Sequence, residues 1–272
     1  MMYAGGDVPS YVQPEHIYKD IPVAEWESSE YSRTAKLVGM GPWKIKEIVN
    51  GESITYVPNE YYFKGTTPKT GSLKIDIVSP DTIVSEMKAG NYDIAEMPAD
   101  QLDSYKDASN LNLVGSLESA YEYISFNLGK YDEASEKNIM DENAKMNDVK
   151  LRQAIAYAID TKTAGEKLYN GLYHPATSLI ISFFGDLHDS EVEGYSYDPD
   201  KANELLDEAG YKDVDGDGIR EGKDGKEFKI TFAARKRTEA NEALVQQYIA
   251  WWKEVGLNVE LYTGRTVEIN TF

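Results

Sequence analysis

The sequence predicts a mixed α/β fold, with α+β character, in which short strands alternate with helices. An Asn50-Gly51 pair between two apolar runs marks a β-hairpin. Apolar residues within 151–159 recur at the spacing of one helical face. A second helical stripe at 239–255 ends at Gly256 and leads directly into another apolar run. Strand and helix signals that alternate in this way are typical of α/β and α+β domains.

In the first part of the chain, turn and cap signals place the predicted elements. Residues 1–37 contain three prolines and few apolar runs, so an extended and irregular lead-in is expected. The hairpin strands span 43–49 and 53–58, and a helix over 80–89 ends at Gly90. The remaining elements are expected as strands at 73–78, 92–96, 112–117 and 121–128, with a short helix at 99–106.

In the second part, aspartates mark the helix starts and glycines the helix ends. Asn147 or Asp148 can cap the first of two helices within 149–170, and Asp160 can cap the second. The other elements are expected in this order: a polar surface excursion at 129–147, a long loop at 172–197, a helix from Asp198-Pro199 to Gly210, an acidic loop at 213–225, a strand at 228–233, a helix at 239–255 and a strand at 257–261.

Composition excludes several classes of function. The chain carries 28 basic and 47 acidic residues, a formal charge of −19, which disfavours binding to nucleic acid. The absence of cysteine excludes disulfides, thiolate zinc sites and cysteine nucleophiles. No apolar run approaches the roughly 18 residues that a membrane span needs. The sequence also lacks a nucleophile-elbow, P-loop or dinucleotide motif, so we expect no enzyme.

The acidic loop has the spacing of a calcium loop of the EF-hand type. Side-chain oxygens fall at loop positions 1, 3, 5, 9 and 12, and position 7 can offer a backbone carbonyl. The candidate ligands are Asp213, Asp215, Asp217, Ile219, Glu221 and Asp224. The twelfth position is an Asp rather than the usual Glu, and no proper entering helix of the EF-hand type directly abuts the loop. A hydrated acidic turn is the alternative to a structural Ca²⁺ site.

Two segments are candidate ligand contacts. Tyr121, Tyr123 and Ser125 alternate on one face of the expected strand, and a polar aromatic face of this kind can line a cleft. An ordinary exposed strand face is the alternative. Arg235, Arg237 and Asn241 lie at the strand-to-helix junction 234–241, and such junctions are frequent ligand sites in α/β sheets. Simple helix capping is the alternative there.

Seven segments, taken in order, resemble the oligopeptide- and dipeptide-binding proteins of ABC importers, which form the extracellular solute-binding protein family 5. The style of the sequence is similar to Gram-positive members. Each segment alone is a weak signal, but their order makes the resemblance specific. The segments are Gly39–Lys46, Asn59–Tyr62, Ala89–Ala95, Tyr123–Asn127, Leu151–Asp160, Asp198–Tyr211 and Trp252–Val259.

The resemblance implies a partial fold of the periplasmic-binding-protein-like type II, in which a peptide is enclosed between two lobes. Residues 38–118 would be part of the first lobe, and residues 119–272 the truncated first part of the second lobe. The early first lobe, its lipid-bearing cysteine and the later second lobe would lie outside this fragment. The resemblance implies these ligand contacts: Tyr121, Tyr123, Ser125, Asn127 and Asn241.

The implied partners are an oligopeptide ligand and the membrane permease of an ABC transporter. The implied location is extracellular, on a surface lipoprotein of a Gram-positive bacterium whose lipid anchor lies outside this fragment. The resemblance implies no organic cofactor. The alternative hypothesis is a calcium-stabilised acidic module for adhesion or surface interaction, with no role in transport.

Overall fold

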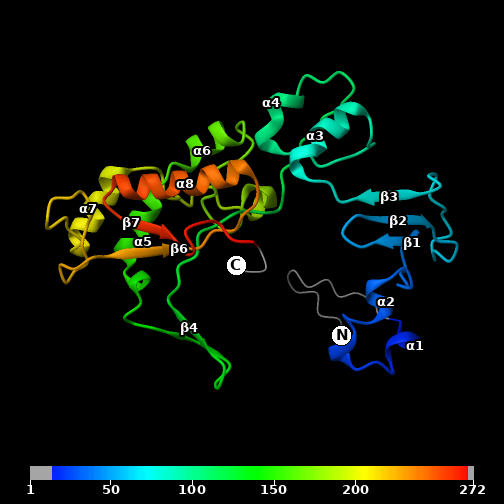
Figure 1. The fold of residues 1–272 in the computed structure, drawn as a ribbon, viewed down its shortest axis with the longest axis horizontal. Helices are drawn as coiled ribbons and strands as arrows, with labels where there is room; N and C mark the ends of the chain where they lie inside the picture. The colour runs from blue at the N-terminus through cyan, green and yellow to red at the C-terminus, as the bar shows by residue number, and fades with distance from the viewer. Residues whose placement is uncertain (1–13, 269–272) are drawn as a thin grey trace. The chain divides into compact units, whose positions relative to one another are not determined.

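A computed structural model describes residues 14–268 of the chain (Figure 1). Contacts divide the chain into two units, one ending at Thr82 and the other beginning at Ile83. The expected lobe boundary after residue 118 stays a prediction. Residues 1–13 of the expected lead-in lie outside the described part. Among the described residues, no helix has both the length and the apolar character that a membrane crossing requires.

The first unit is built on a three-stranded antiparallel sheet in the order β1-β2-β3. The strands are β1 (Trp43–Val49), β2 (Ser53–Pro58) and β3 (Leu73–Asp76). Gly51 adopts a positive φ of 75° in the turn between β1 and β2, which confirms the predicted hairpin. Asn59 secures the start of the hairpin because its side-chain amide donates to the carbonyl of Gly41 over 2.9 Å.

The segment before the sheet forms single helical turns rather than the extended course that we expected. They are α1 (Glu15–Tyr18), the 3₁₀ turn η1 (Val23–Glu25) and α2 (Glu30–Arg33). The rings of Tyr18 and Trp26 meet at 5.3 Å, and the Tyr18 hydroxyl lies 3.0 Å from the Ser32 hydroxyl. Aromatic packing between turns therefore organises a segment without apolar periodicity.

Three predicted strands are absent from the described part of the second unit. Helix α3 (Pro80–Ala89) ends at Gly90 as predicted, and the expected helix at 99–106 forms as η2 (Ala99–Gln101) and α4 (Leu102–Tyr105). The predictions of strands at 92–96, 112–117 and 121–128 are wrong, because these segments join no ladder with another described segment. A segment forms a β-strand only when a neighbouring segment pairs with its backbone, and the alternation of apolar residues does not specify that neighbour.

A β-hairpin forms within the polar surface excursion expected at 129–147. Strand β4 (Gly129–Asp132) pairs with β5 (Lys137–Met140), and the 3₁₀ turn η3 (Lys145–Asn147) follows. The turn between the strands lacks glycine. Glu136 supplies the positive φ, 54°, and the Asp132 carboxylate accepts from the backbone N–H of Ser135 over 3.1 Å.

Aspartate caps start the next three helices, as predicted. Asp148 caps α5 (Val149–Tyr157), Asp160 caps α6 (Thr161–Leu168) and Asp198 caps α7 (Pro199–Ala209). In each case the side-chain carboxylate accepts from backbone N–H groups of the first turn. The long loop between α6 and α7 contains one 3₁₀ segment, η4 (Ser182–Leu187).

The second unit closes with a parallel strand–helix–strand unit. Strand β6 (Lys229–Phe232) runs parallel to β7 (Asn258–Leu261), and α8 (Glu239–Glu254) connects them. The core packs this unit against α5 and α7. Trp252, only 3% exposed, donates its indole N–H to the carbonyl of Ile155 over 3.1 Å. Helices α5 and α8 are thus joined by packing and by a buried hydrogen bond.

Candidate functional site

The tyrosine segment, residues 119–128, has two different faces although it forms no strand. Ile124 and Phe126 pack against the core of the second unit. Tyr123, 75% exposed, and Ser125 point to solvent, and the rings of Tyr121 and Tyr123 approach to 5.9 Å. The segment therefore presents one polar aromatic face, which consists of Tyr121, Tyr123 and Ser125 and is called the tyrosine face below. The opposite, apolar face fixes the segment to the core.

At the end of the tyrosine segment, Asn127 serves the following hairpin. Its side-chain oxygen accepts from the backbone N–H of Gly129 over 3.0 Å, at the start of β4. The residue is exposed, so its amide N–H₂ stays open to solvent. Asn127 thus has both a turn-forming role and a free donor beside the tyrosine face.

The junction between β6 and α8, residues 233–238, contains the buried Ala234 and ends at the helix cap. Thr238 is the N-cap, and its hydroxyl accepts from the backbone N–H of Asn241 over 3.2 Å. Asn241 itself is half-buried, and its side-chain oxygen has no hydrogen-bond partner among the described residues. Thr238 therefore caps the helix, and the side-chain oxygen of Asn241 is left as an acceptor without a donor among the described residues.

An ion pair brings the two candidate segments together. The Arg237 guanidinium pairs with the carboxylate of Glu122, which lies between Tyr121 and Tyr123. Both side chains are 47% exposed, so the pair lies at the surface. The structure thus places the tyrosine face next to the junction that leads to Asn241.

The acidic loop brings three of its six predicted ligands together. Carboxylate oxygens of Asp213, Asp215 and Glu221 lie within 4.8 Å of one another, the only such grouping of His, Asp and Glu side chains in 14–268. Asp217 instead accepts from the backbone N–H of Ile219, and Asp224 pairs with Lys226 at 3.2 Å.

Backbone groups of the loop already use several of these oxygens. Asp213 accepts from the N–H groups of Gly216 and Gly218, at 2.7 and 2.9 Å, and Glu221 accepts from Val214 at 2.7 Å. The donor set suits a hard cation, and such hydrogen bonds also hold a hydrated turn. Calcium binding by this loop stays a prediction.

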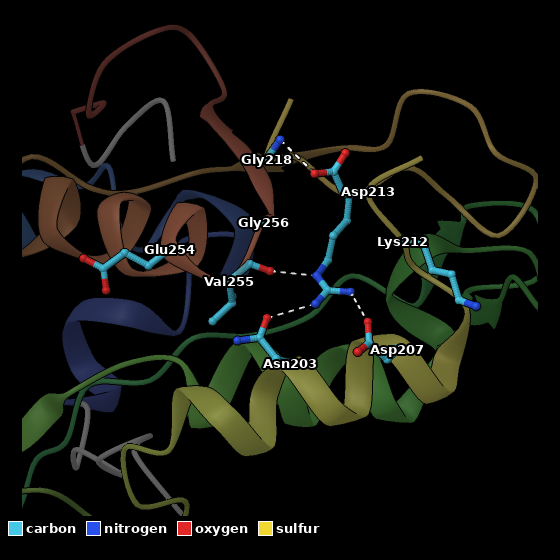
Figure 2. Close-up of a pocket in the computed structure, with 9 residues that line it drawn as sticks. Asn203, Asp207, Lys212, Asp213, Gly218, Glu254, Val255 and Gly256 are labelled. Atoms are coloured by element: carbon cyan, nitrogen blue, oxygen red, sulfur yellow. Dashed lines mark hydrogen bonds and ion pairs between the residues drawn. The ribbon is translucent and has the colours of Figure 1, made fainter. Parts of the chain in front are cut away.

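Arg220 fixes the acidic loop to the body of the second unit. Its side chain is 13% exposed and lies beside a pocket of about 570 Å³. The guanidinium donates to the carbonyl of Val255 over 2.9 Å, to the Asn203 side-chain oxygen over 2.9 Å and to the Asp207 carboxylate over 2.5 Å, all drawn in Figure 2. A cation at the carboxyl end of α8 also complements the helix dipole.

A second cation of the loop, Lys223, reaches the cap of α5. Its ammonium lies 2.6 Å from the Asp148 carboxylate and over the ring of Tyr211. Burial alone would raise the pKa of Asp148, but Lys223 and the capped backbone N–H groups bring that pKa below its usual value. Burial, together with the Asp148 charge, raises the pKa of Tyr211 to about 12.

The sequence did not point to Arg220, Lys223 or Glu122. Arg220 is the single arginine among the acidic residues of 213–224, which is the one signal that could have marked it. Lys223 and Glu122 carry no such signal, because their partners lie far away in the sequence.

Comparison with known proteins places this chain among solute-binding proteins. Residues 7–270 match the model of the bacterial extracellular solute-binding proteins, family 5 (middle). The oligopeptide-binding protein OppA of Lactococcus lactis subsp. lactis (strain IL1403) is 38% identical over 263 residues, which are 96% of this chain and 43% of that protein. The chain therefore spans about half the length, or less, of the relatives it matches.

Solved structures of oligopeptide-binding proteins also match this chain. Lactococcal OppA, complexed with an endogenous peptide in the closed conformation, superimposes with a TM-score of 0.87 at 38% identity. The match covers 96% of this chain and 48% of that one. AppA of Bacillus subtilis, in complex with a nonapeptide, superimposes with a TM-score of 0.76 at 27% identity, over 96% of this chain and 48% of that chain.

Proposed function

We propose a function from one premise, that this chain belongs to the family 5 bacterial extracellular solute-binding proteins. The proposed function is that the chain, in its full-length protein, captures oligopeptides for an ABC importer. The same premise predicts the absence of catalysis, because a solute-binding component only binds and delivers. The relatives lend no support to the alternative, a calcium-stabilised adhesion module, and we do not propose it.

One observation supports the proposal most directly. The tyrosine segment exposes Tyr123 and Ser125 while Ile124 and Phe126 fix it to the core, in a chain 38% identical to a protein whose structure holds an endogenous peptide. A face fixed in this way can contact a ligand without first becoming ordered. The proposed contacts are Tyr121, Tyr123, Ser125, Asn127 and Asn241.

The chemistry of these groups suits a ligand of variable sequence. Hydroxyl and amide groups can bond to a peptide backbone, which is common to every peptide. Tyrosine rings add contact area at little entropic cost, and water can fill what a side chain leaves empty. We therefore propose broad specificity in peptide sequence. Closure of two lobes over the peptide would give the form that the permease recognises.

We also propose the site of action. The family is extracellular, and the similarity to lactococcal OppA favours the outer surface of a Gram-positive cell. We propose attachment by a lipid carried outside residues 1–272. Metabolic labelling of the producing cell with a radioactive fatty acid tests this part, since an unlabelled protein would contradict it.

The test is a binding measurement on the full-length protein. A mixed library of tri- to octapeptides is offered to protein that has been unfolded, freed of endogenous ligand and refolded, and bound peptide is identified by native mass spectrometry. We expect retained peptides and about fivefold weaker retention by Tyr123→Ala, the loss that one stacked aromatic contact implies. Tyr131→Ala removes another exposed tyrosine, in β4, and should leave retention unchanged. No retained peptide in the refolded wild type would contradict the proposal.

A further inference from the structure

The chain contains the Asn-Gly dipeptide twice, once in each unit. Asn50-Gly51 lies in the turn between β1 and β2, and Asn170-Gly171 follows α6. In this dipeptide an asparagine side chain can react with its own backbone. The amide carbon Cγ lies within reach of the next backbone nitrogen, and a glycine there has no side chain that would hinder the approach. The two copies place the same chemistry in two environments.

In the first copy, both reacting groups are free. Asn50 and Gly51 are exposed. The N–H of Glu52 closes the turn by donating to the carbonyl of Val49 over 3.0 Å. Neither the Asn50 side chain nor the Gly51 N–H forms a hydrogen bond with another residue of 14–268. Solvent is therefore the competitor for the amide and for the nitrogen that would attack it.

In the second copy, the same groups are held by hydrogen bonds. The Asn170 amide N–H₂ donates to the carbonyls of Ala99 over 2.9 Å and Asp100 over 3.2 Å. The Gly171 N–H donates to the Gly165 carbonyl over 2.9 Å. Asn170 is also half-buried. A reaction at this copy has to break these bonds first, which requires a local opening of the structure.

We propose that Asn50 is a site of spontaneous deamidation in the folded protein, whereas Asn170 is protected. The Gly51 nitrogen loses its proton and attacks Cγ of Asn50, so that a new N–C bond forms and the side-chain nitrogen leaves as ammonia. Water then opens the cyclic imide at either carbonyl and yields aspartate or isoaspartate. The net change consumes water and releases ammonia. This inference goes beyond peptide capture and does not depend on it.

The product alters the β1–β2 hairpin in two ways. A carboxylate appears near Glu52, in a chain that already carries a formal charge of −19. Isoaspartate also carries the main chain through its side-chain carbon, which lengthens the connection between Val49 and Ser53, the pair of residues nearest the turn. Because turn type and loop length fix the register of a hairpin, the isoaspartate form should hold β1 and β2 together less firmly.

The experiment follows both dipeptides in the same sample. The folded full-length protein is incubated in water enriched in heavy oxygen, at neutral and at mildly alkaline pH, and peptide mapping by mass spectrometry measures the converted fraction at Asn50 and at Asn170. The heavy label distinguishes conversion during the incubation from conversion during digestion. A parallel incubation in urea gives the rates of the two dipeptides when neither is held by the fold.

Two variants test the effect on the hairpin. Asn50→Gln is the variant, because its longer side chain would have to close a larger ring. Asn143→Gln is the matched control, since Asn143 is also exposed but is followed by Ala144 rather than by a glycine. Hydrogen exchange at the amides of β1 and β2 is measured in both variants and in the wild type, before and after the incubation.

We expect conversion in the folded protein to be at least about tenfold faster at Asn50 than at Asn170, because hydrogen bonds hold the second site. In urea the two rates should become similar. Conversion should accelerate as pH rises, because the attacking nitrogen has to lose its proton. After the incubation, exchange in β1 and β2 should be faster in the wild type and in Asn143→Gln and unchanged in Asn50→Gln.

Several results would overturn the inference. Equal rates at the two sites in the folded protein, or no conversion at Asn50 over a time that converts it in urea, would refute deamidation controlled by the fold. A difference of the same size in urea would refute it as well, because the neighbouring residues rather than the hydrogen bonds would then set the rates. Unchanged hydrogen exchange in converted wild type would refute the effect on the hairpin.

Discussion

The acidic loop at 213–225 and the tyrosine segment at 119–128 are both irregular in backbone, yet their side chains are used in opposite ways. In the acidic loop, carboxylates accept from the loop's own N–H groups, while Arg220 and Lys223 reach into α5, α7 and α8. In the tyrosine segment, only Ile124 and Phe126 face the protein, and the polar groups face solvent.

The difference indicates which of the two segments is better suited to contact a ligand. Groups whose hydrogen bonds are already satisfied inside the protein gain little from a ligand, whereas exposed donors and rings on a fixed backbone are free to gain contacts. A conspicuous motif in sequence, such as the spaced acids of 213–224, can therefore be mainly structural. The less regular tyrosine segment is the better candidate for binding.

The largest expected loss of stability comes from removing Arg220, which fixes the acidic loop to the rest of the unit. Arg220→Ala removes a nearly buried guanidinium with acceptors on α7 and at the end of α8, and should lower the free energy of unfolding by about 3 kcal/mol. Arg237→Ala, which removes a half-exposed arginine, should cost about 0.5 kcal/mol. Urea unfolding of both variants of the full-length protein measures the difference. Equal losses would contradict the contrast between the two cations.

The next largest loss of stability distinguishes the buried face of the tyrosine segment from its exposed face. Phe126→Ala takes a ring out of the core and should lower the free energy of unfolding by about 2.5 kcal/mol. Tyr123→Ala alters an exposed ring and should change it by less than about 0.5 kcal/mol. The same unfolding curves test this prediction. A large loss in Tyr123→Ala would mean that the tyrosine face is packed rather than open.

A smaller effect concerns Asp148, which joins the acidic loop to α5. Asp148→Ala removes both the cap and the pair with Lys223 and should cost about 1.5 kcal/mol at pH 7. Asp148→Asn keeps a good cap and loses only the charge, so it should cost less.

The pH dependence of stability isolates the charge of Asp148. The pKa of Asp148 is lowered in the folded protein, so its stabilisation is present above about pH 4, the ordinary aspartate value, and is lost as pH falls through the folded pKa. The stability gap between wild type and Asp148→Asn should therefore close in acid. A gap that persists to low pH would refute this assignment.

The smallest expected effect comes from the calcium-loop hypothesis. If Asp213, Asp215 and Glu221 bind Ca²⁺, calcium at about five times its dissociation constant should stabilise the full-length protein by about 1 kcal/mol relative to chelator. Asp213→Asn should abolish the shift, and Asp224→Asn should retain it because Asp224 pairs with Lys226. A melting temperature insensitive to calcium would leave the loop as a hydrated turn.

Local chemistry explains what the sequence could predict. Helices α5, α6 and α7 begin at the predicted aspartates because each cap is formed with backbone groups two or three residues away. The β1–β2 hairpin was predictable for the same reason, since its turn contains the adjacent Asn50 and Gly51, with Gly51 at positive φ. The exposed face of Tyr123 and Ser125 followed from simple alternation.

Non-local contacts explain what the sequence could not predict. The expected strand at 121–128 fails because pairing depends on a neighbour that the alternation pattern cannot specify. The β4–β5 hairpin was missed because Glu136, and not a glycine, supplies the positive φ of its turn. Arg220 and Lys223 find partners in α7, α8 and the cap of α5, which no spacing within 213–225 encodes.

The burial of Trp252 and its neighbour Trp251 has a practical consequence for spectroscopy. The four tryptophans are divided evenly between the two units, with Trp26 and Trp43 in the first and the buried Trp251 and Trp252 in the second. Emission from the second pair should lie at shorter wavelength, because indoles shielded from water emit from a less relaxed excited state. Replacing either pair by phenylalanine would therefore yield a fluorescence signal specific to one unit, so that the melting of each unit could be followed separately in the intact chain.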